Sequence, residues 1–152
     1  MPAGVGRYVH GVSELVLPGW EPGTVCLLAT AGEEPHAIPV STALRAGDRD
    51  VLLALGARRG ALQRLREDPR VALAVLAAGD LAFTAHGEAS VVADPLEGLD
   101  GVVGVRVAVD RISEHGRPTF EIESGVGWSW TDEAARLRDE QVRAALLALS
   151  AS

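Results

Sequence analysis

The sequence contains no lysine and only one cysteine. All 14 of its permanently basic residues are arginine. The lack of lysine excludes Schiff-base chemistry and a phosphate-binding P-loop, because both need the lysine amine. Cys26 by itself can form neither an internal disulfide nor a CxxC metal or redox pair. No histidines and carboxylates stand at metal-ligand spacing, so we expect no metal, and no Ser-His-Asp order identifies catalytic residues.

Long hydrophobic runs and an excess of positive charge are also missing. Nothing resembles a membrane-spanning helix, and the first residues lack the basic start and apolar run of a secretory signal. We therefore expect a cytoplasmic protein. A net charge of −7 argues against nucleic acid as the main partner. With 47% hydrophobic residues in 152, the chain is expected to form one domain, residues 1–152.

The most informative stretch that is present runs over residues 58–75, RRGALQRLREDPRVALAV. Its five arginines and two carboxylates give a local charge of +3. Such a concentration in an acidic chain predicts a site for one discrete anion, such as a cofactor phosphate. The pattern also predicts a short helix over 59–67, with Leu62 and Leu65 facing the core and Pro69 ending it. The apolar run Val71–Ala77 is expected to be a strand covered on both faces.

Alternating and β-branched segments elsewhere predict a mainly β protein. Residues 1–20 are expected to be irregular, and residues 31–34 to form a hairpin turn. Pro39 within a strand implies an edge position, because proline cannot donate to the ladder. The further strands expected are Thr24–Thr30, Pro35–Leu44, Val51–Leu55, Ala82–Val92, Val102–Ile112 and Phe120–Ile122.

The last part of the sequence, residues 131–149, predicts a helix. Thr131 is its expected N-cap, and Asp132 and Glu133 fall in its first turn. Six or seven strands, one short internal helix and this C-terminal helix together predict a small β-barrel with α decorations. The apolar stripe of the helix is expected to consist of Leu137, Val142, Leu146 and Leu149.

Three blocks in this order resemble a known superfamily: LATAGEEPHAIPVSTAL at 28–44, VLLALGARRGALQRLREDPRVALAV at 51–75, and HGEASVV at 86–92. The DPRVAL run at 68–73, which follows a strand and an arginine-rich turn, is the strongest element. The blocks are similar to the FMN-binding split barrels of the pyridoxamine 5′-phosphate oxidase-like proteins, which include F420-dependent reductases. The resemblance implies a split β-barrel that forms a homodimer, with flavin sites at the interface and a small-molecule substrate.

The resemblance also implies which residues hold the cofactor. Many members have a lysine eight residues before the proline of the DPRV run, where this chain has Ala61; the arginines stand two and three residues earlier. A guanidinium can still bind a phosphate in bidentate fashion. The cofactor phosphate would lie near Leu55, Gly56, Ala57, Arg58 and Arg59, with Arg64 as a further candidate, and the ring system along Pro39, Val40, Ser41 and Thr42.

Several residues allow a structural interpretation beside the functional one. Arg64, Arg66 and Arg70 are expected mainly in surface ion pairs. Trp128 and Trp130 either stack on a flavin or substrate or, as the pattern slightly favours, pack the last helix onto the barrel and the dimer partner. His36 and His86 are expected in structural roles, and Cys26 is expected to be inert.

Three functions remain open at this point. The first is an FMN-binding oxidoreductase that transfers hydride between a nicotinamide or small organic substrate and flavin. The second keeps the fold and uses F420, whose polyanionic tail would also suit arginines. The third is a non-catalytic module that binds flavin or heme.

Overall fold

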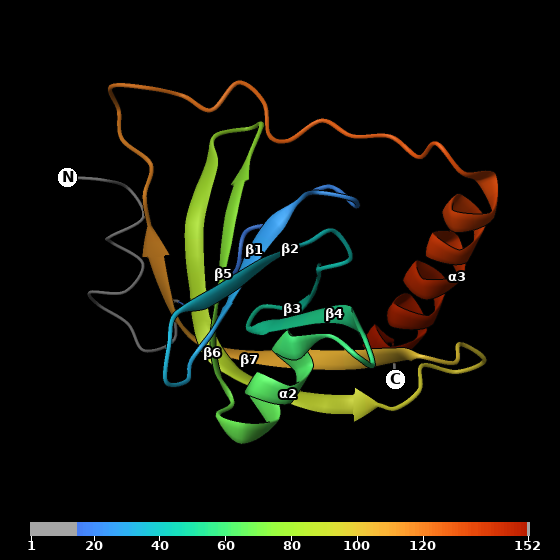
Figure 1. The fold of residues 1–152 in the computed structure, drawn as a ribbon. Helices are drawn as coiled ribbons and strands as arrows, with labels where there is room; N and C mark the ends of the chain where they lie inside the picture. Colours follow the sequence, from blue (N-terminus) through green and yellow to red (C-terminus); the bar gives the residue numbers. More distant parts are fainter. Residues whose placement is uncertain (1–14, 152) are drawn as a thin grey trace.

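The computed structural model describes residues 15–151. Seven antiparallel strands form one sheet in the order β2-β1-β5-β6-β7-β4-β3. The two edge strands, β2 and β3, are not paired with each other, so the sheet curls into a barrel that does not close (Figure 1). The elements are β1 (Cys26–Thr30), β2 (His36–Val40), β3 (Leu44–Gly47), β4 (Asp50–Gly56), α2 (Gly60–Glu67), β5 (Arg70–Ala77), β6 (Leu81–Ala93), β7 (Val102–Glu114) and α3 (Glu133–Ser150).

β6 and β7 are the longest strands and carry the bend of the sheet. Their register shifts between His86 and Gly87, which marks a β-bulge. At Gly87 a Cβ atom would overlap the carbonyl oxygen of Ala108, so only glycine allows β7 to approach this closely. Because β6 and β7 bend at this bulge, the pair contributes to both halves of the barrel.

The core has two parts, one inside the barrel and one beneath α3. Val51, Leu53 and Leu55 of β4 point inward and meet residues of β5 and β7. Leu52 points the other way and packs against Val142 and Leu146 of α3. This alternation follows from the period of two in a strand.

The helices agree with the sequence pattern, with two differences at α3. In α2, Leu62 and Leu65 are buried and close one end of the barrel, as predicted. The cap of α3 is Asp132 instead of Thr131, because the Asp132 carboxylate accepts a hydrogen bond from the Ala134 amide at 2.9 Å. Leu137 is 46% exposed and does not belong to the apolar stripe.

Three strand predictions are wrong in detail. The strand expected over 35–44 ends at Val40, and the chain crosses from one edge of the sheet to the other before β3 begins at Leu44. Residues 120–122 are not a strand; the Ile122 amide donates to the side chain of Asp80 instead. β5 is buried on one face only, since Leu76 on its outer face is 55% exposed. Pro39 lies on edge strand β2, as expected.

None of the helices within residues 15–151 has the length and hydropathy needed to cross a membrane. Of the segment 1–20 that was expected to be irregular, the first 14 residues lie outside the described part of the chain.

Candidate functional site

The turn between β4 and α2, residues 56–60, carries the arginine pair singled out by the sequence; we call it the arginine turn. Its backbone is fixed by the Arg59 amide, which donates to Gly56 O at 3.0 Å, and by the Ala57 amide, which donates to Gly101 O at 2.8 Å. Arg58 and Arg59 are exposed, and within residues 15–151 their guanidinium groups have no carboxylate partner. The start of α2 has no side-chain cap and no acid in its first turn.

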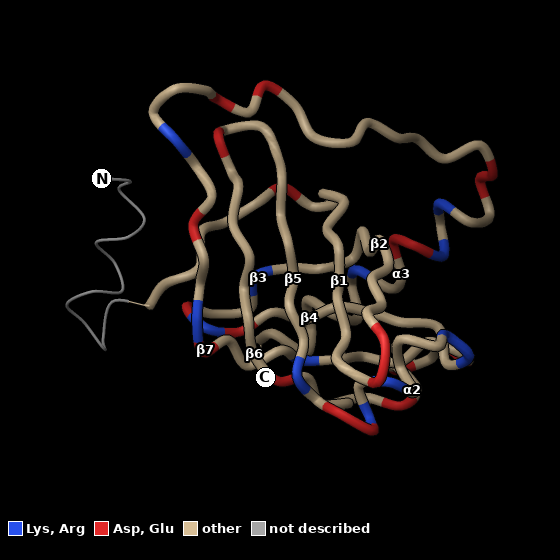
Figure 2. Tube along the Cα trace, turned by 60° about the vertical axis from the view of Figure 1, so that its left-hand side comes forward, with Lys and Arg blue, Asp and Glu red and all other residues tan. Residues whose placement is uncertain are grey.

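The other arginines of this stretch are paired, as expected. Arg66 binds Asp94 at 3.0 Å and Arg70 binds Asp68 at 2.7 Å. Hydrogen bonds from Arg70 lower the pKa of Asp68 to about 2. Figure 2 shows basic and acidic residues interleaved around α2. The arginine turn therefore differs from its surroundings in having uncompensated charge.

Arg64 lies on α2 one helical turn after Gly60, the last residue of the arginine turn. Its Nη2 donates to Glu34 Oε1 at 3.1 Å, and it lines a hollow of about 600 Å³ between α2 and the turn that joins β1 to β2. The structure therefore gives Arg64 a carboxylate partner that Arg58 and Arg59 lack.

The residues expected along the flavin ring lie next to the arginine turn. Thr42 stands beside β4, where its hydroxyl accepts from the Ala54 amide at 3.0 Å and donates to Ala54 O at 3.3 Å. Ala54 directly precedes Leu55 and Gly56, so the two predicted segments meet. We call residues 39–42 the ring strand.

The residues predicted to bind the cofactor, in segments 39–42 and 55–59, present different chemical groups to a ligand. The side chains of Val40 and Leu55 are buried in the core, and their backbones pair with β1 and β7, so neither side chain is available to a ligand. The hydroxyl of Thr42 is already engaged with Ala54. The hydroxyl of Ser41 has no partner within the described range, and Ser41 is half-buried.

Trp128 and Trp130 lie on the strap, the irregular segment 115–132 that joins β7 to α3 across the molecule (Figure 1). The Trp128 indole donates to Gly23 O at 2.9 Å. The two rings meet edge to face with centroids 5.2 Å apart, and each side chain is 41% exposed. Both rings therefore keep accessible surface beside the start of β1.

Arg143 of α3 is a residue that the sequence analysis did not single out. Its Nη2 donates to Ser41 O at 3.1 Å, and its Nε donates to Asp139 Oδ2 at 2.6 Å. The Asp139–Arg143 spacing of four on a helix is the signal that was available, but it does not reveal the contact with the ring strand. The side chains of Arg143 and Asp139 are 21% and 13% exposed.

His36 and His86 contact neighbouring hydroxyl groups, and Cys26 is buried. His36 contacts the Thr30 hydroxyl at 3.4 Å, and His86 Nε2 contacts the Ser113 hydroxyl at 3.2 Å. Burial raises the pKa of the Cys26 thiol to about 12, which keeps it protonated and unreactive. Among residues 15–151, no three potential metal ligands come together.

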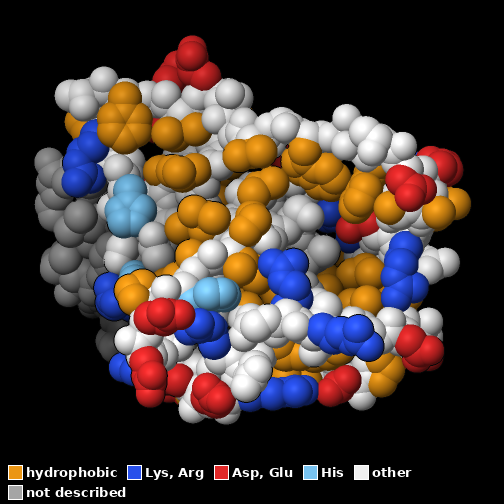
Figure 3. Space-filling model, viewed as in Figure 1, with side chains coloured by type: hydrophobic (Ala, Val, Ile, Leu, Met, Phe, Trp, Pro, Cys, Tyr) orange, Lys and Arg blue, Asp and Glu red, His pale blue; other side chains and the backbone are white. Residues whose placement is uncertain are grey.

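The outward side of strands β2, β1 and β5 is largely apolar and accessible, and it continues onto β6 with the polar side chains of Thr84 and His86; we call it the outer face. Leu27 of β1 is 49% exposed and stands between Pro39 on one neighbour and Ala74 on the other. Leu76 and small side chains such as Ala72 continue the face. Figure 3 shows hydrophobic side chains gathered across one side of the molecule, with histidines among them. A contiguous apolar surface of this kind is typical of an interaction site.

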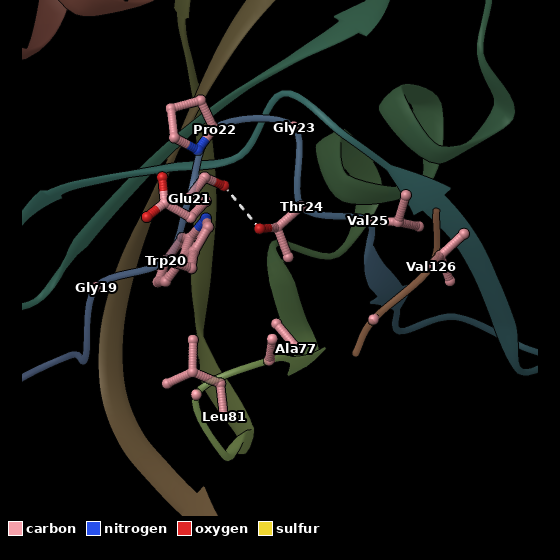
Figure 4. A pocket seen from close by; sticks show the side chains of 13 residues that line it. Gly19, Trp20, Glu21, Pro22, Gly23, Thr24, Val25, Ala77, Leu81 and Val126 are labelled. Atoms are coloured by element: carbon pink, nitrogen blue, oxygen red, sulfur yellow. Dashed lines mark hydrogen bonds between the residues drawn. The ribbon is translucent and has the colours of Figure 1, made fainter. Parts of the chain in front are cut away.

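A second hollow of about 600 Å³ lies away from the arginine turn, under the strap (Figure 4). It is lined by residues 19–25, by residues 77–79 and Leu81, and by Gly125 and Val126. The Thr24 hydroxyl in its wall donates to Glu21 O at 2.6 Å. None of the residues expected to bind the cofactor lines it.

No family model matches this sequence, and no curated protein does. Solved structures match by shape. A candidate pyridoxamine 5′-phosphate oxidase from Lactobacillus delbrueckii is 15% identical with a TM-score of 0.52, over 59% of this chain and 83% of that one. Another from Listeria innocua is 18% identical with a TM-score of 0.50, over 60% and 87%. A heme-binding protein from Mycobacterium smegmatis is 18% identical with a TM-score of 0.50, over 60% and 48%.

The chain has the pyridoxamine 5′-phosphate oxidase-like split-barrel fold. The open seven-stranded sheet with one internal and one C-terminal helix agrees with this assignment. At identities of 18% and below, the matches establish the fold of this split barrel and leave its ligand to be argued from the chain's own residues.

Proposed function

We propose that this split barrel is a flavin-dependent oxidoreductase that binds FMN and works as a homodimer. The observation that carries the proposal is the arginine turn, where two exposed guanidinium groups without a carboxylate partner in the described chain stand at an uncapped helix start. Exposed arginines that keep their charge uncompensated are suited to a phosphate, which accepts bidentate hydrogen bonds from guanidinium.

The arginine turn fits a phosphate in its backbone as well. The first amides of a helix point outward and favour an anion, and no acidic side chain in the first turn of α2 competes for them. Ala61, at the position where many members of the resembled superfamily have a lysine, is buried in the core and cannot contribute a charge. Arg58 and Arg59 are therefore the residues that would hold the phosphate.

The ring strand would orient the ring system. The Ser41 hydroxyl is free to bond a polar ring edge, whereas the Thr42 hydroxyl fixes the strand to β4. Bound flavin would supply hydride transfer to or from a nicotinamide or small organic substrate. The chain itself would anchor the phosphate, orient the ring and shape an apolar pocket beside it.

The outer face supports the homodimer. Two half-exposed leucines within a surface of small apolar residues would be buried by a second copy, and a symmetric pair presents the same face twice. The strap, with its accessible tryptophans, lies over the same side of the barrel as the start of β1 and is available to a partner.

The test is FMN affinity of Arg58→Ala with Arg59→Ala, measured by flavin fluorescence titration. Charge-assisted hydrogen bonds contribute about 1.5–3 kcal/mol each, so we expect Kd to rise by about 100-fold or more. The matched control, Arg66→Ala with Arg117→Ala, removes the same charge elsewhere and should bind FMN within about threefold of the natural protein. Unchanged FMN binding by a folded Arg58→Ala, Arg59→Ala protein would reject the proposed phosphate site.

Heme binding is the second candidate, because one solved structure of this fold is a heme-binding protein and this chain places histidines on its outer face. His86 and His115 are near neighbours there. His86 contacts the Ser113 hydroxyl, and His115 contacts the Thr84 hydroxyl. Separate titrations with FMN, F420 and hemin distinguish the candidates. A saturable flavin spectrum supports the proposal, F420 binding alone moves the protein to the deazaflavin reductases, and a Soret band without flavin binding favours heme.

A further inference from the structure

A small pocket lies between α3 and the edge of the sheet, next to the ring strand; we call it the α3 pocket. It has a volume of about 140 Å³ and is lined by Trp20 and Pro22, by residues 42–44, and by Arg143 and Leu147. Trp20 and Pro22 separate it from the larger hollow under the strap, which they also line. Thr42, the last residue of the ring strand, forms part of the wall of the α3 pocket.

The polar groups of the lining side chains are mostly engaged within the chain. The Trp20 indole donates to Ala43 O at 2.9 Å. The Thr42 hydroxyl both donates to and accepts from the Ala54 backbone. Arg143 has five N–H groups, of which Nε–H binds Asp139 and one on Nη2 binds Ser41 O. The remaining N–H groups of Arg143, including both on Nη1, have no partner in residues 15–151, and because Arg143 lines the pocket they can donate to an acceptor on a ligand.

The charge of Arg143 is already compensated. Its Nε lies 2.6 Å from Asp139, and the side chains of the pair are 21% and 13% exposed, so water screens the pair little. Asp139 does not line the pocket, but its carboxylate already balances the charge of Arg143, so the pocket offers an anionic ligand little net attraction. A neutral ligand needs no such attraction and also suits the apolar walls formed by Pro22, Leu44 and Leu147.

The size of the pocket limits the ligand further. An apolar protein cavity of about 150 Å³ holds a benzene molecule, so 140 Å³ holds one six-membered ring. We propose that the α3 pocket binds a neutral cyclic carbonyl compound, whose ring fills the apolar part and whose oxygen accepts a hydrogen bond from Arg143. Binding of this compound to the α3 pocket does not depend on the proposed flavin site. Only the conclusion that it represents the substrate class rests on that site.

The experiment uses the flavin-free protein and two probes of the same size, cyclohexanone and cyclohexanecarboxylate. Binding is followed in ¹H–¹⁵N spectra through the Trp20 indole signal and the amides of residues 42–44. We expect saturable shifts with cyclohexanone at a Kd in the millimolar range, because a ligand with so few non-hydrogen atoms can gain only a small binding free energy. The carboxylate should bind about 10-fold more weakly or not at all. Equal or tighter binding of the carboxylate, or no shift at these residues with cyclohexanone, overturns the proposal.

Leu147→Trp supplies the decisive variant. Leu147 is exposed at the rim, so the larger side chain can fill the α3 pocket without entering the core. It should abolish the cyclohexanone shifts while the circular dichroism spectrum stays unchanged. The matched control is Leu137→Trp, at an exposed site on the same helix that does not line the pocket, and it should bind as the natural protein does. Retained binding by Leu147→Trp places the ligand elsewhere and rejects the proposal.

Arg143→Met tests the hydrogen bond, since methionine keeps much of the stem and removes the donor. It should weaken cyclohexanone about 10-fold, the value expected for a hydrogen bond from a charged group. The outcomes separate the two proposals. FMN binding without cyclohexanone binding rejects this inference alone, and cyclohexanone binding without FMN binding rejects the proposed function alone.

Discussion

His86 is a histidine whose pKa is lowered by its surroundings. It lies on β6, where its Nε2 contacts the Ser113 hydroxyl of β7. Partial burial lowers its pKa from the ordinary value of 6.5, and the positive charges of Arg111 and His115 act in the same direction, whereas Asp110 opposes them. The folded state therefore disfavours the protonated imidazole relative to the unfolded chain.

This lowered pKa gives the stability a pH dependence with a defined sign. Below about pH 6.5 the unfolded state binds a proton at His86 that the folded state resists, so the free energy of unfolding should fall as the pH falls. We expect the natural protein to lose stability between pH 7.5 and 5.5 and His86→Gln to lose less, as measured by urea unfolding at each pH. Parallel slopes for the two proteins would show that His86 does not contribute.

At the scale of single elements, α3 depends on its N-cap residue, Asp132. The Asp132 carboxylate accepts from the amides of Ala134 and Ala135, which otherwise have no partner at a helix start. Asp132→Ala should lower the free energy of unfolding by about 1 kcal/mol, since this is the usual effect of losing an N-cap. Thermal and urea unfolding measure it. Thr131→Ala, one residue earlier, is the matched control and should change little; the reverse order of effects would show that the helix begins at Thr131.

Some elements of the fold can be predicted from the sequence, and others cannot. Both helices and most strands follow from local periodicity and from Pro69, because these signals lie within a few neighbouring residues. The break at residues 41–43 does not, because there the Thr42 side chain replaces a backbone partner and binds Ala54, which is 12 residues away. The three alternating residues at 120–122 lack a neighbouring strand, so their pattern misleads.

The candidate site also has one part that the sequence predicts and one part that it does not. Arg58 and Arg59 are visible in the sequence because their charge is concentrated against an acidic background. Arg143 is not, because its contact with Ser41 joins residues 102 positions apart and depends on how α3 lies on the barrel. Local chemistry thus predicted the proposed phosphate end, while the pocket beside α3 required the tertiary structure.

At the scale of the whole molecule, β6 and β7 lie between a half of the sheet that α3 covers and a half that is exposed. One half of the sheet is covered by α3 and buries Leu52 beneath it. The other half, formed by β2, β1, β5 and β6, leaves the outer face uncovered, with Leu27 and Leu76 about half exposed. The outer face and the ring strand share Pro39 of β2, so a partner that covers the outer face also covers this end of the ring strand.

Leu27→Arg tests this arrangement, because Leu27 stands near the middle of the outer face. In a symmetric dimer the change would bury one unpaired charge from each copy, and such a charge costs about 3–5 kcal/mol. We therefore expect the natural protein to be a dimer by light scattering at micromolar concentration and Leu27→Arg to be a folded monomer with weakened FMN binding. Leu137→Arg makes the same substitution at an exposed site on α3 and should remain a dimer. A natural protein that is monomeric, or a Leu27→Arg protein that still dimerises, would mean that the outer face does not bind a second copy, and the proposed flavin site would then have to be complete within one chain.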